Sequence, residues 1–222
     1  SSIYYNNGLF IGKKNEVYRY NEETGNFDLY YQLPGENLEI ICMHIYKGYL
    51  WMGTTTNGVY RLDIDKKELT HPIKKGNITS FYRDSEGELW IGSWEEGLFH
   101  VKTDGKIENF RYDAKNPHSL SSNFVRACCE DNLGNIWIGT FNGLNRYNKS
   151  TGLFQNHPAN DIQTDGLTHS SIWCIVKDNQ GTLWLGTYFG GVNYFNPEYE
   201  IYTRYSLSLI HISEPTRRTP IS

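Results

Sequence analysis

Gly134-Asn135-Ile136-Trp137-Ile138-Gly139-Thr140 is the stretch of sequence that decides the fold, because it recurs along the chain. Three other copies share its central feature, a tryptophan two residues before a glycine, and a weaker first copy carries Phe10 before Gly12. These glycines are separated by 41, 39, 47 and 47 residues, a period typical of repeat architectures. The Trp/Gly pairs are Trp51 and Gly53, Trp90 and Gly92, Trp137 and Gly139, and Trp184 and Gly186.

Each repeat contains about four short strand-like runs, here named A to D. In the fourth repeat an apolar run over 124–129 is followed by the turn Asp131-Asn132-Leu133-Gly134, and then by runs over 135–140, 144–147 and 153–156. Four antiparallel strands every ~40–45 residues predict an all-β fold, a β-propeller of four-stranded antiparallel blades. Because one blade cannot bury both faces, we expect the repeated tryptophan to pack against the next blade.

The repeats predict about five blades in the chain, as a fragment of a longer array. The first blade is expected to lack its inner A strand, since its B strand lies close to Ser1. Residues 206–222 interrupt the pattern and are predicted to be a non-native tail that plays no part in the fold. The predicted blades cover residues 1–36, 37–75, 76–112, 113–156 and 157–205.

The composition narrows the classes of partner. The formal net charge is −4 and no basic run occurs, which argues against nucleic acid as a partner. No run of 18 apolar residues is present, so no segment of this sequence is predicted to span a membrane. We expect no cofactor, because neither a glycine-rich phosphate loop nor a nucleophile motif appears.

The four cysteines, Cys42, Cys128, Cys129 and Cys174, all fall in predicted A strands. Cys42 and Cys128 each lie six residues before a turn glycine, which predicts that they occupy the same position in two blades. Buried free thiols are the main expectation. A disulfide between Cys174 and either Cys128 or Cys129 is the alternative, and the spacing does not favour a metal site.

With these motifs in place, the chain resembles the two-component regulator propeller repeat. The fourth repeat matches the pattern Asp-x-x-Gly-x-Ile-Trp-Ile-Gly-Thr followed by Gly-Leu-x-Arg-Tyr nearly position for position, and residues 116–121 match the connection before an inner strand. The resemblance extends over roughly residues 8–205. Three departures are Phe10 in place of tryptophan, Ile45 in place of aspartate and Ser93 in place of threonine.

The resemblance implies a function that the residues alone do not. Such repeats form the periplasmic sensor of hybrid two-component histidine kinases in polysaccharide-degrading bacteria, anchored in the inner membrane. The implied signal is an oligosaccharide released from a glycan, and the implied full-length protein is a homodimer with further blades and downstream signalling domains. The chain itself is then not an enzyme. A standalone carbohydrate-binding or protein-interaction propeller is the alternative, and a propeller lyase or hydrolase is a third hypothesis.

The B–C turns are the expected place for a ligand, because they hold different residues on a repeated scaffold. Aromatic residues stand in these turns where glycine, asparagine or aspartate is usual, and a sugar ring stacks its apolar face on such side chains. Carboxylates and amides nearby would bind its hydroxyl groups. The candidate ligand residues are Trp94, Glu95, Glu96, Asn57, Phe141, Asn142, Tyr188 and Phe189.

Two further patterns invite chemistry and are given less weight. Glu95-Glu96 resembles half of a catalytic carboxylate arrangement, although a solvated pair of loop charges is far more common. The connection between the last two blades holds two histidines and two aspartates, but their spacing is irregular and we expect no metal site. Those residues are His157, Asp161, Asp165 and His169.

Overall fold

The computed structural model describes residues 1–6, 8–35, 37–159 and 166–205. Over these residues the chain is all-β and forms five four-stranded antiparallel sheets. In every sheet the strands lie side by side in chain order, so each sheet is a simple meander. This arrangement confirms the predicted propeller fold with five blades. None of the described segments forms a helix that could cross a membrane.

The strands of the first two blades span residues 2–73. Blade 1 consists of β1 (Ser2–Tyr5), β2 (Gly8–Lys13), β3 (Glu16–Asn21) and β4 (Asn26–Gln32). Blade 2 consists of β5 (Ile40–Tyr46), β6 (Tyr49–Thr54), β7 (Val59–Asp63) and β8 (Leu69–Ile73).

The other three blades span residues 78–205. Blade 3 consists of β9 (Ile78–Arg83), β10 (Leu89–Ser93), β11 (Leu98–Val101) and β12 (Ile107–Phe110). Blade 4 consists of β13 (Val125–Glu130), β14 (Ile136–Thr140), β15 (Gly143–Asn148) and β16 (Leu153–His157). Blade 5 consists of β17 (Ile172–Lys177), β18 (Leu183–Thr187), β19 (Val192–Asn196) and β20 (Ile201–Tyr205).

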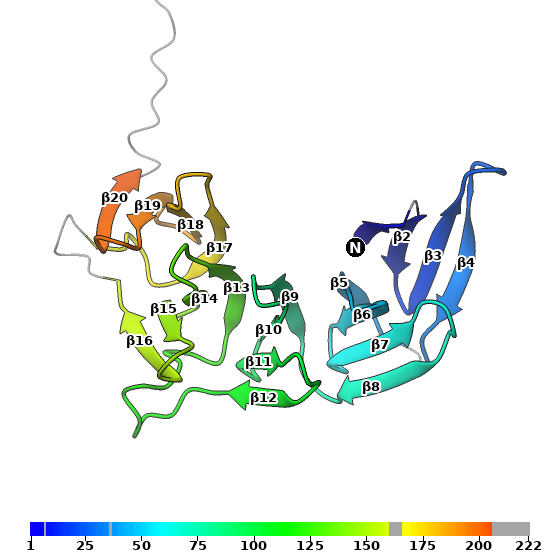
Figure 1. The fold of residues 1–222 in the computed structure, drawn as a ribbon, viewed down its shortest axis with the longest axis horizontal. Helices are drawn as coiled ribbons and strands as arrows, with labels where there is room; N and C mark the ends of the chain where they lie inside the picture. Colours follow the sequence, from blue (N-terminus) through cyan, green and yellow to red (C-terminus); the bar gives the residue numbers. More distant parts are fainter. Residues whose placement is uncertain (7, 36, 160–165, 206–222) are drawn as a thin grey trace, which may run out of the picture.

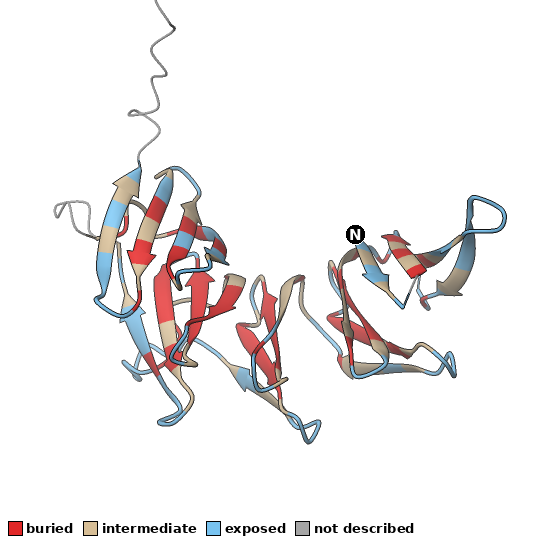
Figure 2. Ribbon diagram, turned by 45° about the horizontal axis from the view of Figure 1, so that its top comes forward, coloured by how far each residue is buried: buried red, intermediate tan, exposed pale blue. Residues whose placement is uncertain are grey.

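The five blades follow one another along an open arc, with blades 1 and 5 at its two ends (Figure 1). The A strands β5, β9, β13 and β17 contact their neighbours in succession, so one edge of the arc is lined by A strands. The buried residues are concentrated in the middle strands of blades 2 to 4 (Figure 2).

Blade 1 is complete, which corrects the prediction that it lacks its inner strand. Residues 2–5 form β1 and pair with β2 from Ser2 opposite Ile11 to Tyr5 opposite Gly8. The prediction failed because this strand carries none of the apolar length of the other A strands, and only the pairing with β2 identifies it.

In blades 1 to 4 the residue at the tryptophan position packs on strand C of the next blade. There are four such pairs, and the two members of each pair belong to the same hydrophobic cluster. In the two pairs made of aromatic residues the ring centroids are 4.9 Å and 5.4 Å apart. The pairs are Phe10 with Leu62, Trp51 with Val101, Trp90 with Tyr147, and Trp137 with Phe195. The predicted structural role of the tryptophans is thereby explained for blades 2 to 4, where their side chains are buried.

A carboxylate in the A–B turn holds this tryptophan in blades 3 to 5. One oxygen of this aspartate, Oδ1, accepts a hydrogen bond from the backbone N–H four residues later, which closes the turn. The other oxygen, Oδ2, accepts a hydrogen bond from the indole of the tryptophan. The donor–acceptor pairs are Trp90 with Asp84 (2.9 Å), Trp137 with Asp131 (2.8 Å) and Trp184 with Asp178 (2.9 Å).

Blade 2 uses a different turn, and this changes two alignments made from the sequence. Tyr46 pairs with Tyr49 across the two-residue turn Lys47-Gly48, so Tyr46, and not Ile45, takes the place of the aspartate. Both turn residues have positive φ, as a tight hairpin of this kind requires. Trp51 consequently has no hydrogen-bond partner for its indole nitrogen among the described residues.

The same register corrects the cysteine alignment. Cys42 pairs with Gly53 and Cys174 pairs with Gly186, whereas Ala127 holds this position in blade 4 and Cys128 lies one residue further on. All four thiols are free, so the alternative of a disulfide is wrong. Cys128 and Cys129 are buried as expected, Cys42 is partly buried, and Cys174 is exposed. Burial raises the pKa of the Cys42 thiol to about 12.

In blades 1 to 4 the glycine of strand B lies against the first residue of the next blade's A strand. An added Cβ would lie 2.6 Å from Cγ2 of Ile78 at Gly53, 3.1 Å from Cγ1 of Val125 at Gly92, and 2.6 Å from Cγ2 of Ile172 at Gly139. Only glycine leaves room for this approach, so the repeated glycine is a contact between blades and not a turn residue.

Blade 5 presents the same face without a partner in the described chain. At Gly186 an added Cβ would meet only Sγ of Cys174, within its own blade. Trp184 is 36% exposed, compared with 2% for Trp51 and 0% for Trp137. This face therefore has the shape of a blade contact that nothing in the described residues fills.

We predict that Gly139→Ala lowers the free energy of unfolding by about 1–3 kcal/mol, because the added methyl group overlaps Ile172. Ile172→Ala removes the overlapping atom but leaves a cavity of its own. In chemical denaturation the double variant should therefore lose less than the sum of the two single losses. Additive losses would show that the glycine does not act through this contact.

Candidate functional site

The B–C turns have one repeated construction that places variable side chains on the same face. The hydroxyl group at the end of strand B donates to the glycine carbonyl that begins strand C, at 2.8–3.0 Å in blades 2 to 5. The backbone N–H of the residue after this hydroxyl donates to the connection that precedes strand A of the same blade. The turn is thus fixed by backbone and hydroxyl groups, and its other side chains are free to differ. The hydroxyl residues are Thr54, Ser93, Thr140 and Thr187.

Two of the predicted ligand residues meet in a first aromatic cluster, formed by Trp94, Phe124 and Phe141. Trp94 lies edge-on to Phe124 and Phe141, with ring centroids 5.2 Å and 5.5 Å away. Trp94 also forms an isolated bridge with Phe124, which ties the B–C turn of blade 3 to the start of blade 4. Phe141 is exposed, so this cluster presents an apolar surface to solvent.

The other two predicted aromatics belong to a second aromatic cluster on blade 5, formed by Trp173, Tyr188 and Phe189. Tyr188 lies 5.3 Å from Trp173 and 4.2 Å from Phe189 between ring centroids. All three side chains are exposed. The structure therefore divides the four predicted aromatics into two groups from neighbouring blades.

Arg126 lies between the two aromatic clusters and was missed by the sequence reasoning, together with Phe124 and Trp173. Its guanidinium carbon is 3.7 Å from the ring centroid of Trp173 and 5.3 Å from that of Trp94. The signal was present in the sequence: Arg126 and Trp173 each follow the β-branched residue that opens an A strand. Only the strand register shows that this position reaches the neighbouring blade.

The predicted carboxylates behave differently from each other. Glu96 forms ion pairs with Lys75 (2.9 Å) and with Arg111. Hydrogen bonds from Lys75 and Arg111 outweigh partial burial and hold the pKa of Glu96 below its ordinary value. Glu95 is exposed and makes no ion pair among the described residues. The two side chains are therefore not equivalent, and Glu96 is engaged in linking blade 3 to its neighbouring connections.

The predicted amides lie apart. Asn57 forms a bridge with Gly76 in the turn between blades 2 and 3. Asn142 donates from Nδ2 to the carbonyl of Ser121 at 3.3 Å, beside Phe141 of the first aromatic cluster. Of the two predicted amides, only Asn142 therefore lies next to a residue of an aromatic cluster.

The histidine-rich connection gives no metal cluster in the part of the chain that the structure describes. Asp161 and Asp165 lie outside the described residues. His157 is partly buried beside Trp137, with ring centroids 5.2 Å apart, and burial lowers its pKa. His169 lies 6.1 Å from Phe189, at the edge of the second aromatic cluster.

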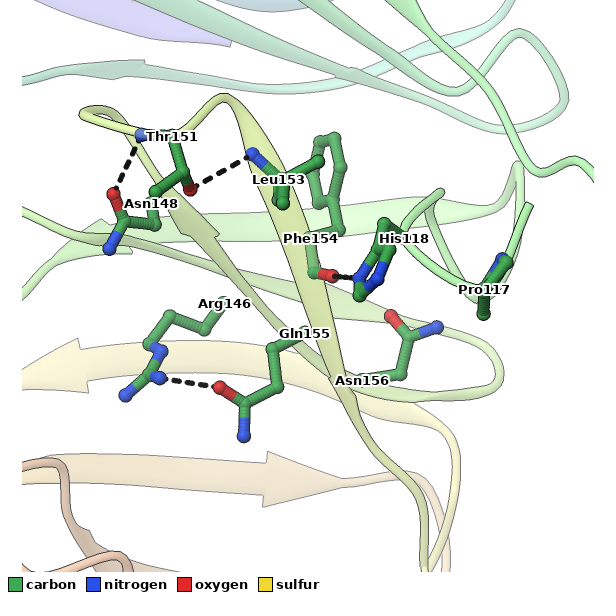
Figure 3. A pocket seen from close by; sticks show the side chains of 9 residues that line it. All are labelled: Pro117, His118, Arg146, Asn148, Thr151, Leu153, Phe154, Gln155 and Asn156. Atoms are coloured by element: carbon green, nitrogen blue, oxygen red, sulfur yellow. Dashed lines mark hydrogen bonds between the residues drawn. The ribbon is translucent and has the colours of Figure 1, made fainter.

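A separate hollow of about 430 Å³ lies on the outer strand β16 of blade 4 (Figure 3). Most of its polar side chains bond to one another or to the strand: Arg146 donates to Gln155, and the ring of His118 contacts the carbonyl of Phe154. It shares no residue with the two aromatic clusters and none of the predicted ligand residues lines it.

Comparison with known proteins agrees with the repeat pattern. The family model described as two component regulator propeller matches residues 72–95, 119–142 and 166–189. Each match runs through strands A and B of one blade into its B–C turn. The resemblance seen in the sequence is thereby confirmed, and blades 3 to 5 carry the matches. No curated protein matches the sequence.

Solved structures with this fold include bacterial surface and extracellular domains. The chain is 24% identical to the extracellular domain assigned to a one-component system of B. thetaiotaomicron, with a TM-score of 0.70. The matched region covers 97% of this chain and 28% of that structure. It is 13% identical to PorZ, a surface component of the type-IX secretion system of Porphyromonas gingivalis, with a TM-score of 0.67. This match covers 93% of the chain and 33% of PorZ. The WD40 propeller domain of Doa1 is 15% identical, with a TM-score of 0.58, and this match covers 89% of the chain and 63% of that structure.

These likenesses establish the fold. The chain spans about a third or less of the length of the two bacterial structures.

We predict that Glu96→Gln lowers the free energy of unfolding by about 1 kcal/mol at pH 7, because two partly exposed ion pairs are lost. Glu95→Gln, the matched control, should leave it unchanged. Since the folded-state pKa of Glu96 is lowered, its contribution is fully present above the unfolded value of ~4.3 and is lost progressively as the pH falls from there through the lower folded-state pKa. Urea unfolding at pH 7 and pH 3.5 tests both points; equal losses in the two variants would contradict this assignment.

Proposed function

We propose that this chain, which is built of two component regulator propeller repeats, is part of an extracytoplasmic sensor that binds a glycan-derived oligosaccharide. The observation that carries the proposal is the pair of aromatic clusters beside the B–C turns, in which Phe141, Trp173, Tyr188 and Phe189 are exposed. The turns share one hydrogen-bonded framework, yet each displays different side chains. A surface of this construction can be adapted to a ligand without any change to the blades.

The side chains on this face suit a sugar better than they suit a reaction. Exposed aromatic rings offer flat apolar surfaces for the C–H face of a pyranose, and Asn142 beside Phe141 offers a hydrogen-bonding amide. Glu96 is held in ion pairs with Lys75 and Arg111, and Glu95 is an exposed turn side chain. We therefore propose a binding role and not a hydrolase or lyase.

The parent protein is proposed by resemblance. The family description and the extracellular domain of similar fold support a place outside the cytoplasm, which we propose is the periplasm. In this proposal the parent is an inner-membrane hybrid two-component histidine kinase that acts as a homodimer. The propeller contributes ligand binding, and kinase and phosphorelay steps belong to other domains.

The exposed face of blade 5 supports the further proposal that another blade follows it. Val192 of blade 5 is 40% exposed, whereas the equivalent Val59, Leu98 and Leu144 are fully buried by the next blade. Gly186 leaves the space that Gly53 and Gly139 leave for an isoleucine. A sixth blade that opens with a β-branched residue would fit this face. A standalone five-bladed module remains the rival hypothesis, and it requires another way to cover these side chains.

Binding of oligosaccharides from plant and host polysaccharides, measured by calorimetry, tests the proposed function. We predict that Phe141→Ala weakens binding about three- to tenfold, because a stacking surface is removed. Phe27→Ala is the matched control: its ring is 41% exposed, compared with 40% for Phe141, but it lies in blade 1 at the start of strand D.

The expected result is a loss of affinity in Phe141→Ala and none in Phe27→Ala. Equal effects of the two substitutions, or no binding of any oligosaccharide to the unaltered chain, would contradict the proposed function.

A further inference from the structure

A β-bulge near the start of strand A re-aims one side chain in each of blades 2 to 5. The register shifts by one residue there, so that the residue after the β-branched one has no partner on strand B. A bulge of this kind turns a side chain out of the sheet's alternation. The bulged residues are Ile41, Thr79, Arg126 and Trp173.

In blades 3 and 4 the bulged side chain reaches the following blade. Thr79 donates from its hydroxyl group to the carbonyl of Val125 at 2.6 Å. Arg126 lies over the ring of Trp173, the next bulged residue, and near Trp94 of the preceding blade. One guanidinium therefore connects three blades, with an indole on either side.

Unlike Arg111 and Arg146, Arg126 has no anionic partner among the described residues. Arg111 pairs with Glu96 and Arg146 pairs with Glu200. No ion pair or hydrogen bond is formed by the Arg126 guanidinium within residues 1–6, 8–35, 37–159 and 166–205, and its Nε is buried without a partner. Burial lowers the pKa of Arg126, and no carboxylate of the described residues offsets this effect.

Arg126 as a whole is only partly buried, so the part of its guanidinium beyond the buried Nε can still be reached by an acceptor from outside. Such an acceptor would supply the hydrogen bonds that the described residues do not. The planar guanidinium matches a carboxylate or a sulfate through two parallel hydrogen bonds. Trp173 is 42% exposed, so its indole still offers apolar surface to the ring that carries such a group. A neutral sugar would use the rings but would leave the cation unpaired.

We infer that Arg126, Trp94 and Trp173 form a binding site for an anionic sugar residue, either a uronic acid or a sulfate ester. This inference rests on the proposed function and adds the class of ligand. Phe141 and Tyr188 then lie at the two sides of the site, where they contact neighbouring sugar units.

Calorimetry on the 222-residue chain tests the inference with three probes: trigalacturonate, its fully methyl-esterified form, and a sulfated galactose trisaccharide. At least one anionic probe should bind ten times more tightly than the neutral ester, and which of the two binds identifies the anion. Arg126→Met should weaken that binding about ten- to hundredfold and remove the preference. Rising salt should weaken anionic binding and leave neutral binding unchanged.

Arg61→Met is the matched control, because Arg61 also lies over aromatic rings, those of Tyr49 and Trp51, but in blade 2. It should bind the anionic probe as the unaltered chain does. Arg126→Lys keeps the charge but loses the paired geometry, so an intermediate loss is expected. This variant and the salt dependence decide the question if Arg126→Met does not fold.

The results separate this inference from the proposed function. If the neutral ester binds as tightly as the anionic probes, or if Arg126→Met binds the anionic probe normally, the anionic site is wrong while glycan binding stands. If no saccharide binds in any form, both the site and the proposed function are wrong.

Discussion

The approach of one blade to the next, through a glycine and past a tryptophan, is the constraint on which the rest of this structure depends. The glycine of strand B admits the first residue of the following A strand, as Gly139 admits Ile172. The tryptophan two residues earlier is then covered by strand C of the same neighbour, as Trp137 is by Phe195. Each blade is thus completed by the next, which is the behaviour expected of a repeat array.

Much of this arrangement could be predicted from the sequence, because it depends on residues that recur with a fixed period. The strands, the turns and the buried tryptophans of blades 2 to 4 follow from that recurrence. The errors arose where a repeat changes length. The short hairpin after Tyr46 moved the alignment of Ile45 and Cys42 by one residue, and β1 lacked a pattern of its own. Counting along the chain does not reveal these shifts, whereas strand pairing does.

The candidate site was predictable only in part, for the same reason. The aromatic residues of the B–C turns stand out as unusual turn residues, and the structure groups them in pairs. Arg126 does not stand out, because an arginine in a strand is common. Its position depends on a bulge that aims its side chain at Trp173 of the following blade, a contact between residues 47 positions apart. The site is therefore a property of how blades meet, and a single repeat could not form it.

The contact between blades also links the fold to the proposed function. The scaffold residues are used by the backbone and by the neighbouring blade, so the side chains of the turns are left for a ligand. Blades 3, 4 and 5 contribute Trp94, Arg126 and Trp173, and a ligand held between them would favour one spacing of these blades. A change of this spacing is a physical means by which binding could be passed along the array.

Hydrogen exchange of the tryptophan indole N–H groups, followed by NMR, tests most directly the claim that each blade is sealed by the next. Slow exchange is expected for Trp90 and Trp137, which donate to a turn carboxylate and are covered by the following blade. Trp184 makes the same hydrogen bond but is not covered in the described chain, so its exchange should be much faster. Equal protection of Trp184 and Trp137 would contradict the sealing of each blade by the next, since burial by the following blade would then not be what protects the indole.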